Sequence, residues 1–532
     1  METLDTLLRG LRIGAPRSTA AAPRPPGSPE GDRPSAAPLS SQAPASPAND
    51  ETPAPPQSVP VPRPTAVETT AAPAATTSRA NRVGLLEREL RNFILNEPTR
   101  PPSPLRPKEV DPRAEPVFEP TAPRSLEEAG LTESDVGSLV LKFLLPRSVE
   151  TGYQIANQIG LRFPIIDQIL RQLKQDKLLT YKNSLTAGDY LYELTDEGRV
   201  RGEKLSRQTT YCGTAPVSLA HYAASVTAQT LSGRKPPLTA IREAMGDLNL
   251  KDSLLSGIGQ AIHSGRGMFL FGPPGNGKTS IAERITKSFG DTIWIPRAVH
   301  ANGEIIRLFD PNRHRLAPSL STEERKEIDG RWVQIQRPTI IAGGELRMEN
   351  LEITYIRSTG IGEAPLQMKS NCGTLLIDDF GRQRMPVDEL LNRWIVPLEQ
   401  RHDYLQLESG RSIQVPFDQL IVFSSNLEPK DLVDDAFLRR IPYKIEVRDP
   451  SEEEFRALFL RQCRELGFEV SQADVDYLIQ SHYRPKNWPF RYCHPRDILR
   501  QIENRCTLHG LPRAVTKDAI DAAVQNYFSI ML

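Results

Sequence analysis

The feature that most constrains the fold is a glycine-rich stretch between an apolar run and a run with helical spacing. Residues 268–271 are all apolar, which predicts a buried strand, and the run after the stretch places its apolar residues on one helical face. Four residues complete the pattern GxxxxGK(S/T): Gly272, Gly277, Lys278 and Thr279. The pattern is meaningful only between a strand and a helix, and both are predicted here. The stretch therefore predicts a loop that binds phosphate groups.

Such a loop points its backbone N–H groups at a polyphosphate, and the positive end of the following helix dipole lies behind them. The Lys278 ammonium would reach the β- and γ-phosphates, and the Thr279 hydroxyl would ligate Mg²⁺. A chance glycine turn with a solvated lysine is the alternative, which the flanking strand and helix disfavour. We therefore expect ATP and Mg²⁺ as cofactors. The nucleotide-binding residues would be Gly272, Pro273, Pro274, Gly275, Asn276, Gly277, Lys278, Thr279 and Ser280.

Composition separates the N-terminal region from the rest. The chain has 532 residues, enough for two to four domains, and its 47 prolines lie mostly toward the N-terminus. Residues 1–124 are therefore expected to be disordered, with short helical islands at 1–14 and 83–95. Residues 1–14 are either a docking peptide or a frayed terminus.

Charge and cysteine usage exclude several classes of protein. The formal net charge is zero, so no overall field indicates a nucleic acid or a membrane surface as partner. The five cysteines have no CxxC spacing, which suggests neither a zinc site nor a disulfide framework. No apolar run approaches the length of a membrane span. We expect a soluble, cytoplasmic protein with no membrane insertion.

Residues 125–207 have the pattern of a small α+β domain. Their spacing predicts helices at 136–145, 152–160 and 164–174, strands at 178–181 and 190–194, and a helix that starts at Thr195. Helix, helix-turn-helix and β-hairpin in this order resemble a winged helix. Residues 192–199 resemble the segment that closes the wing in bacterial winged-helix regulators.

The exposed side of the predicted helix 164–174 bears on whether this domain binds DNA. It carries both acidic and basic residues: Asp167, Gln168, Arg171, Gln172 and Lys174. DNA-binding domains usually show a basic face. A domain that docks onto protein is therefore expected, and DNA binding is the alternative.

Two further apolar runs end in polar residues. Residues 374–377 predict a strand that ends in Asp378 and Asp379, and residues 419–425 predict a strand that ends in Asn426. Asp378 is suited to order Mg²⁺ together with Thr279, and Asp379 is suited to polarise the attacking water. Asn426 would hydrogen-bond this water, and an ordinary turn-initiating asparagine is its alternative.

The phosphate loop, the strand with paired acids and the strand ending in asparagine together resemble the AAA+ ATPases. The resemblance covers about residues 238–532. It implies an α/β nucleotide-binding domain with a parallel sheet at 238–449 and a helical lid at 450–532, after a coupling segment at 208–237. Four helices are predicted in the lid, and Ser451 with Glu454 predicts a capping box at the first.

The resemblance also extends to three arginines. Residues 435–441 resemble the segment that presents an arginine finger to the neighbouring subunit, which assigns this role to Arg439 or Arg440; a solvated basic pair at a helix end is the alternative. Residues 494–499 resemble the second sensor, whose arginine would be Arg496. Because the family supplies the finger in trans, the resemblance implies a ring, most often a hexamer.

Within the family, residues 371–378 and 390–417 resemble enhancer-binding proteins and magnesium-chelatase-like ATPases. In such relatives the region of 332–359 carries an insertion, and residues 341–344 are expected to be either a pore-facing tip or a plain surface hairpin. The loop that engages sigma factor in enhancer-binding proteins is absent, so an activator role is not implied. The family usually has Glu at the position of Asp379. Aspartate is one methylene shorter, so its carboxylate would end roughly an ångström short of the water.

The sequence thus predicts a ring-forming AAA+ ATPase, similar to a bacterial chaperone-like motor, that couples ATP hydrolysis to remodelling of a protein or protein–nucleic-acid partner. One alternative is an ATP-regulated, DNA-binding transcriptional regulator. Another is a nucleotide-gated scaffold with weak hydrolysis, for which the Asp379 departure is the sequence support.

Overall fold

The computed structural model describes residues 118–529, except 185–187, 247, 249, 319–320, 322–326 and 434. The helical islands predicted at 1–14 and 83–95, with most of the expected disordered region, lie outside the described residues. Among the described residues, no helix is both long enough and apolar enough to cross a membrane.

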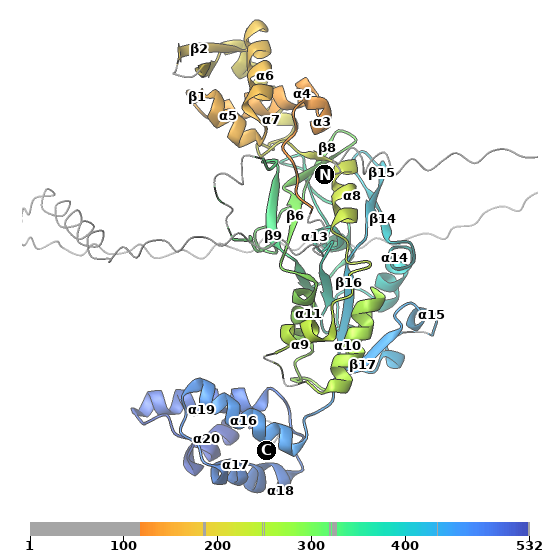
Figure 1. Cartoon of the computed structure of the whole chain (residues 1–532), viewed down its shortest axis with the longest axis vertical. Coiled ribbons are helices and arrows are strands. Elements are labelled where there is room, and N and C mark those ends of the chain that lie inside the picture. Colours follow the sequence, from red (N-terminus) through yellow and green to blue (C-terminus); the bar gives the residue numbers. More distant parts are fainter. Residues whose placement is uncertain are drawn as a thin grey trace, which may run out of the picture. The chain divides into compact units, whose positions relative to one another are not determined.

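A five-stranded parallel sheet positions the candidate site, and Figure 1 labels two of its strands, β16 and β17. The strand order is β10-β13-β16-β5-β17. Its strands are β5 (Met268–Phe271), β10 (Thr339–Ala342), β13 (Thr374–Ile377), β16 (Leu420–Ser425) and β17 (Tyr443–Glu446). Phe423 pairs with Ile377 on one side and with Phe269 on the other, so these strands end at one edge of the sheet. The α/β fold and the strands predicted from the three apolar runs are confirmed.

Alternation along the strands divides the core between the two faces of the sheet. On one face, Phe269, Leu375 and Phe423 pack with Trp394 and other side chains of α14 (Val387–Gln400). On the other face, buried side chains of the strands pack against three helices that flank β5. These are α9 (Leu238–Ala244), α10 (Asp252–Ser264) and α11 (Lys278–Ile285), which continues into the 3₁₀ turn Thr286–Phe289.

The expectation of a surface hairpin at residues 341–344 is wrong. Strand β10 is part of the central sheet and pairs in parallel with β13, with Ala342 beside Ile377. Ile340 and Ala342 are buried against the same face as Leu375. Ile341 and Ala342 therefore belong to a parallel strand rather than to a hairpin, and Gly343 and Gly344 follow in the turn after it.

A mainly β region is inserted between α11 and β10 and continues after it. Strands β6 (Thr292–Pro296) and β9 (Trp332–Gln336) form an antiparallel pair. A mixed sheet has the order β11 (Thr354–Ile356), β12 (Ile361–Glu363), β8 (Glu304–Arg307), β7 (Ala298–Ala301) and β4 (Val217–Ser218). The short helix α13 (Leu366–Lys369) leads to β13, and β14 (His402–Gln406) and β15 (Ser412–Pro416) form the predicted hairpin after α14.

The segment expected to couple the domains packs into this β region. Helix α8 (Leu219–Ala228) buries Tyr222, whose hydroxyl donates to Met368 O at 3.2 Å. Gln229 exchanges two hydrogen bonds with the backbone of Trp294, at 2.7 and 2.8 Å. Tyr222 and Gln229 therefore anchor the segment in the packed interior, because their buried polar atoms find hydrogen-bond partners there.

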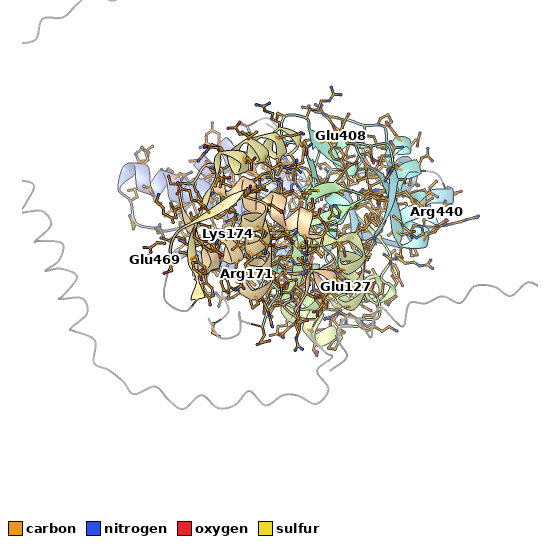
Figure 2. The ribbon with its side chains drawn as sticks, turned by 90° about the horizontal axis from the view of Figure 1, so that it is seen from above. Glu127, Arg171, Lys174, Glu408, Arg440 and Glu469 are labelled. Carbon is orange, nitrogen blue, oxygen red and sulfur yellow. The ribbon has the colours of Figure 1, made fainter. Side chains whose placement is uncertain are left out.

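The module at 125–207 contains the elements predicted for it. Its helices are α3 (Leu126–Ala129), α4 (Glu133–Leu144), α5 (Gly152–Ile159), α6 (Phe163–Gln175) and α7 (Asp196–Gln208). Strands β1 (Glu150–Thr151), β3 (Tyr190–Leu194) and β2 (Leu179–Ser184) form an antiparallel sheet in that order. Arg171 and Lys174 lie exposed on α6 (Figure 2). Arg171 pairs with Asp167 at 2.8 Å, and the Lys174 ammonium lies 3.5 Å from the centre of the Tyr181 ring.

Four helical segments follow β17, as predicted for the lid. They are α16 (Glu452–Leu466), α17 (Gln472–Leu478), α19 (His494–His509) and α20 (Lys517–Tyr527). The predicted capping box of Ser451 and Glu454 is confirmed. Helix α17 continues through a π-helical turn (Ile479–Tyr483) into the short α18 (Arg484–Lys486), an irregularity that the sequence pattern did not predict.

A buried ion pair of the β region also contacts the N-terminal module. The Arg331 guanidinium binds the Asp329 carboxylate through two nitrogens at 2.8 and 3.0 Å, and both side chains are 3% exposed. A third nitrogen of Arg331 donates to Ala129 O at 2.8 Å.

We predict that Arg331→Met lowers the free energy of unfolding by about 3–5 kcal/mol, because it leaves the Asp329 carboxylate buried without its partner. Chemical denaturation followed by tryptophan fluorescence measures the change, since Trp294 and Trp332 lie in the same region of the fold. Lys430→Met is the control, because both side chains of its ion pair with Glu428 are more than half exposed and its loss should not move the transition. Equal stability of Arg331→Met and the wild type would contradict the prediction.

Candidate functional site

The phosphate loop connects β5 to α11 at the carboxyl edge of the central sheet. Gly277 has φ +80° and occupies the N-cap of α11, a left-handed conformation that favours glycine. A Cβ built at Gly277 would meet no other atom within 4 Å, so the loop faces open space at this point. The helix N-terminus behind the loop provides unpaired N–H groups and a partial positive charge, which suit an anion in that space.

Lys278 is held across the loop by three acceptors. Its ammonium donates to Gly272 O at 2.9 Å, to Pro273 O at 3.0 Å and to Asn426 Oδ1 at 2.7 Å. Burial lowers the pKa of Lys278, and the carboxylates of Asp378 and Asp379 oppose this shift. Lys278 is therefore a buried cation at the end of β16, and Asn426 fixes its direction.

Thr279 and Asp378 meet on the same side of the loop. The Thr279 hydroxyl donates to Asp378 Oδ2 at 2.8 Å, although the residues lie 99 positions apart in the sequence. A hydroxyl and a carboxylate oxygen at this separation are the donor types that Mg²⁺ prefers. The residue types present thus fit a magnesium ion, which Thr279 and Asp378 would hold.

Asp379 follows in an unusual backbone conformation. It has φ +49°, is exposed, and lies 3.5 Å from Asn426 through Oδ1 and Nδ2. The Gln383 amide donates to the backbone oxygens of Asp378 and Asp379 at 3.0 and 3.1 Å, which fixes the turn. Aspartate tolerates a left-handed conformation better than most residues. This backbone gives a physical reason for Asp at the position where the AAA+ pattern has Glu.

The loop also contacts the segment that leads into the lid. The Asn276 amide donates to Asp449 Oδ1 at 2.7 Å, and Cys493 N donates to Gly275 O at 3.0 Å. Arg491 forms an ion pair with Asp449. Arg496 is more than half exposed and contacts its neighbour Asp497 at 3.4 Å. Arg491 is thus the lid arginine that the structure brings to the loop.

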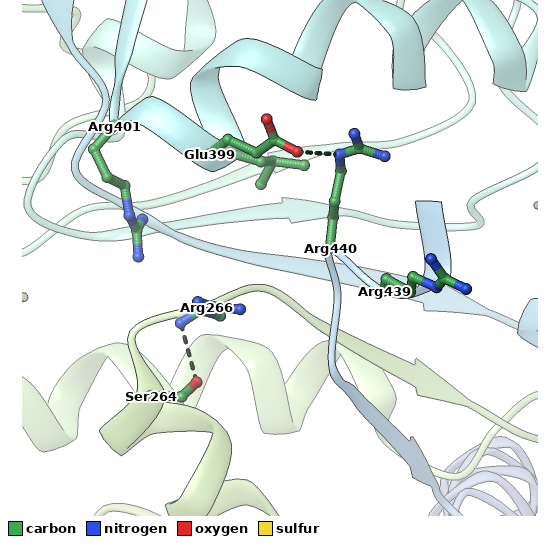
Figure 3. Close-up of a pocket in the computed structure, with 7 residues that line it drawn as sticks. Ser264, Arg266, Glu399, Arg401, Arg439 and Arg440 are labelled. Carbon is green, nitrogen blue, oxygen red and sulfur yellow. Dashed lines mark hydrogen bonds and ion pairs between the residues drawn. The ribbon is translucent and has the colours of Figure 1, made fainter. Parts of the chain in front are cut away.

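Arg439 and Arg440 line a separate pocket of about 570 Å³ (Figure 3). Four arginines and one glutamate contribute to it: Arg266, Arg401, Arg439, Arg440 and Glu399. Arg440 Nε donates to Glu399 Oε1 at 2.7 Å. Ser264 and Arg266 precede β5, so the pocket lies at the amino edge of the sheet, opposite the phosphate loop.

The structure therefore brings five predicted residues together and leaves three apart. Lys278, Thr279, Asp378, Asp379 and Asn426 lie around the loop. Arg439 and Arg440 lie at the opposite edge, and Arg496 points to Asp497. Sequence reasoning missed Gln383, Asp449 and Arg491. Residue type gave no signal for these, because each acts through a contact between distant segments or within an irregular turn.

Comparison with known proteins adds a match in the lid. Residues 451–526 match a family described as a domain of unknown function (DUF8689). No curated protein matches the sequence.

Two solved structures are similar over part of the chain. RuvB of Thermotoga maritima, described as a Holliday junction branch migration motor, shares 12% identity over 54% of this chain and 73% of its own, with a TM-score of 0.31. NtrX of Brucella abortus in complex with ATP shares 14% identity over 53% of this chain and 58% of its own, with a TM-score of 0.33.

His494 begins the lid helix next to the loop contacts and is 8% exposed, with Nδ1 2.9 Å from the Tyr483 hydroxyl. Burial lowers the pKa of His494 to about 4, and the positive charge of Arg491 adds to this. An unfolded histidine has a pKa of about 6.5. Between these values the unfolded chain binds the extra proton, so stability falls as the pH is lowered.

We predict that the lid loses about 2 kcal/mol of stability between pH 7 and pH 5 through His494. His494→Gln should show a smaller loss over the same range, because glutamine does not titrate. Urea denaturation at both pH values measures the difference, and Trp488 reports from the lid. An equal pH dependence in both proteins would contradict the assignment.

Proposed function

We propose that the chain is an ATP hydrolase of the AAA+ type. The observation that carries this proposal is the convergence of Lys278, the Thr279–Asp378 pair and Asn426 from three adjacent strands onto one loop. Ligands bind at the carboxyl edge of such sheets, where the strand order reverses. Strand β5 lies at this point. Its two neighbours in the sheet are β16 on one side and β17 on the other, and both come later in the sequence.

Each residue has a role that follows from its place. The loop N–H groups and Lys278 bind the phosphates and orient them, and Asn426 holds the ammonium in position. Thr279 and Asp378 would hold Mg²⁺, which neutralises charge on the phosphate oxygens when it is bound. Asp379 accepts the proton of the attacking water, and the 3.5 Å distance between Asp379 Oδ1 and Asn426 Nδ2 supports a shared role of the two side chains toward that water.

The arginine pocket supports an assembly in which a second copy completes the site. Arg439 and Arg440 lie at the edge of the sheet opposite their own phosphate loop, so within one chain they face away from it. Four guanidinium groups against one carboxylate suit an anion. We assign Arg440, with Arg439 beside it, to the phosphates bound by a neighbouring copy in a ring, for which a hexamer is the expected size.

The proposed work of this ring is the remodelling of a macromolecular partner in the cytoplasm. The winged-helix interpretation of residues 125–207 supplies a docking module for it. Arg171 already has Asp167 as partner and Lys174 lies on Tyr181, which leaves little charge on α6 for phosphate contacts. These contacts favour a protein partner over duplex DNA. A salt-dependent shift of duplex DNA by the full chain would favour the regulator alternative instead.

We predict that Asp379→Glu raises kcat several-fold, because the longer side chain brings the carboxylate closer to the water. Lys278→Ala should reduce hydrolysis at least about 100-fold, because it removes a charge that stabilises the transferring phosphoryl group. Steady-state phosphate release measures both. The nucleotide-gated scaffold would be supported if the wild type turned over no faster than Lys278→Ala and Asp379→Glu gave no gain.

We also predict that Lys278→Ala and Arg440→Ala, each inactive alone, regain activity when mixed. In a randomly mixed ring about a quarter of the sites combine an intact Lys278 with an intact Arg440 from the neighbour. The matched control mixes Lys278→Ala with Asp379→Asn, which both damage the same chain's site and should stay inactive together. If the first mixture also stays inactive, Arg440 does not act across an interface.

A further inference from the structure

Asp449 lies past the end of β17, on the segment that joins the sheet to the lid. Its Oδ1 accepts a hydrogen bond from Asn276 Nδ2 at 2.7 Å and also forms an ion pair with Arg491. Asn276 belongs to the phosphate loop and is 3% exposed, and Arg491 belongs to the lid. The Asp449 carboxylate therefore binds one residue of the phosphate loop and one residue of the lid.

Backbone contacts reinforce this bridge. Tyr492 N donates to Asn276 Oδ1 at 3.4 Å, and Cys493 N donates to Gly275 O at 3.0 Å. Gly275 has φ +81°, and a Cβ built there would lie 2.5 Å from Cys493 Sγ. The lid segment thus packs directly on the loop, so a change in the loop's backbone has to move residues 491–493.

The side chain at position 276 is suited to this arrangement. The GxxxxGK(S/T) pattern leaves the residue before its second glycine free. An amide carries both a donor and an acceptor, so Asn276 binds the Asp449 carboxylate and the Tyr492 N–H with the same group. Because Asn276 is buried, loss of Asp449 leaves its amide nitrogen only the longer bond to Val447 O at 3.4 Å, and loss of the Tyr492 contact removes a donor to its amide oxygen.

Charge also connects the lid to the phosphates. Arg491 lies against the loop, with its Cβ 4.0 Å from a Cβ built at Gly275. An anion bound in front of the loop would attract the Arg491 guanidinium as well as the Lys278 ammonium.

We propose that Asp449 is a positioning residue that couples the phosphate loop to the lid, by holding Asn276 and Arg491 at the same time. Loop conformation and lid position then change together. The loop and the lid respond together to the polyphosphate of a nucleotide. Arg491, rather than the exposed Arg496, is the lid residue that senses it. The response to nucleotide rests on the proposed function, whereas the coupling itself does not.

Hydrogen exchange of the full-length chain in nucleotide-free buffer tests the coupling. We expect the amides of Tyr492 and Cys493 to exchange about tenfold faster in Asp449→Asn than in the wild type, because the neutral side chain loses its charged bond to Arg491. Asn276→Asp should have the same effect, since it places two carboxylates side by side. Arg513→Ala is the matched control, a lid arginine paired with Glu503 at 2.6 Å, and it should leave both amides unchanged.

Binding of a fluorescent ATP analogue tests the response to nucleotide. We expect Arg491→Ala to weaken binding about tenfold and Arg491→Lys to restore much of it, because the lysine keeps the charge. Asn276→Ala and Arg491→Ala should be non-additive, since both act through Asp449. Thermal unfolding of each variant shows whether the fold is intact.

The outcomes separate this proposal from the proposed function. Wild-type exchange rates in both Asp449→Asn and Asn276→Asp overturn the coupling, even if the chain binds ATP through Lys278. Additive effects of the Asn276 and Arg491 variants also overturn it. Failure of the wild type to bind the ATP analogue overturns the proposed function, while faster exchange in the two variants would still support the coupling.

Discussion

The lateral pairing of β13, β16 and β5 is the constraint on which the candidate site depends. Three parallel strands end at one edge, where Asp378 follows β13, Asn426 follows β16, and the phosphate loop follows β5. The Lys278–Asn426 and Thr279–Asp378 hydrogen bonds join these ends across gaps of more than ninety residues in the sequence. The site is therefore a consequence of strand register, and a shift of one residue between neighbouring strands would separate its groups.

The two edges of the central sheet carry different groups. The carboxyl edge gathers the loop, the acids and the amide, and the amino edge gathers four arginines around Glu399. A site that needs both edges is incomplete within one chain, which is why the proposed activity requires a second copy. The Arg440–Glu399 bond at 2.7 Å keeps one guanidinium oriented at this edge before any partner arrives.

Much of the fold and the centre of the site could be predicted from the sequence, because apolar runs and loop chemistry are local signals. Strands at 268–271 and 374–377, the helices of the lid and the capping box at Ser451 belong to this group. The placement of β10 could not, since a short alternating run has the same pattern in a hairpin and in a central sheet. Asp449 and Arg491 were missed because their contact exists only after the lid packs on the loop.

Specific ATP hydrolysis by the full chain over a wide range of protein concentrations, with mass photometry on the same samples, tests whether a second copy completes the site. We expect activity per chain to rise together with the fraction of assembled rings and to level off when assembly is complete. Activity per chain that is constant from monomers to assemblies would contradict a site completed by a second copy. Rings without any turnover would contradict the hydrolase itself.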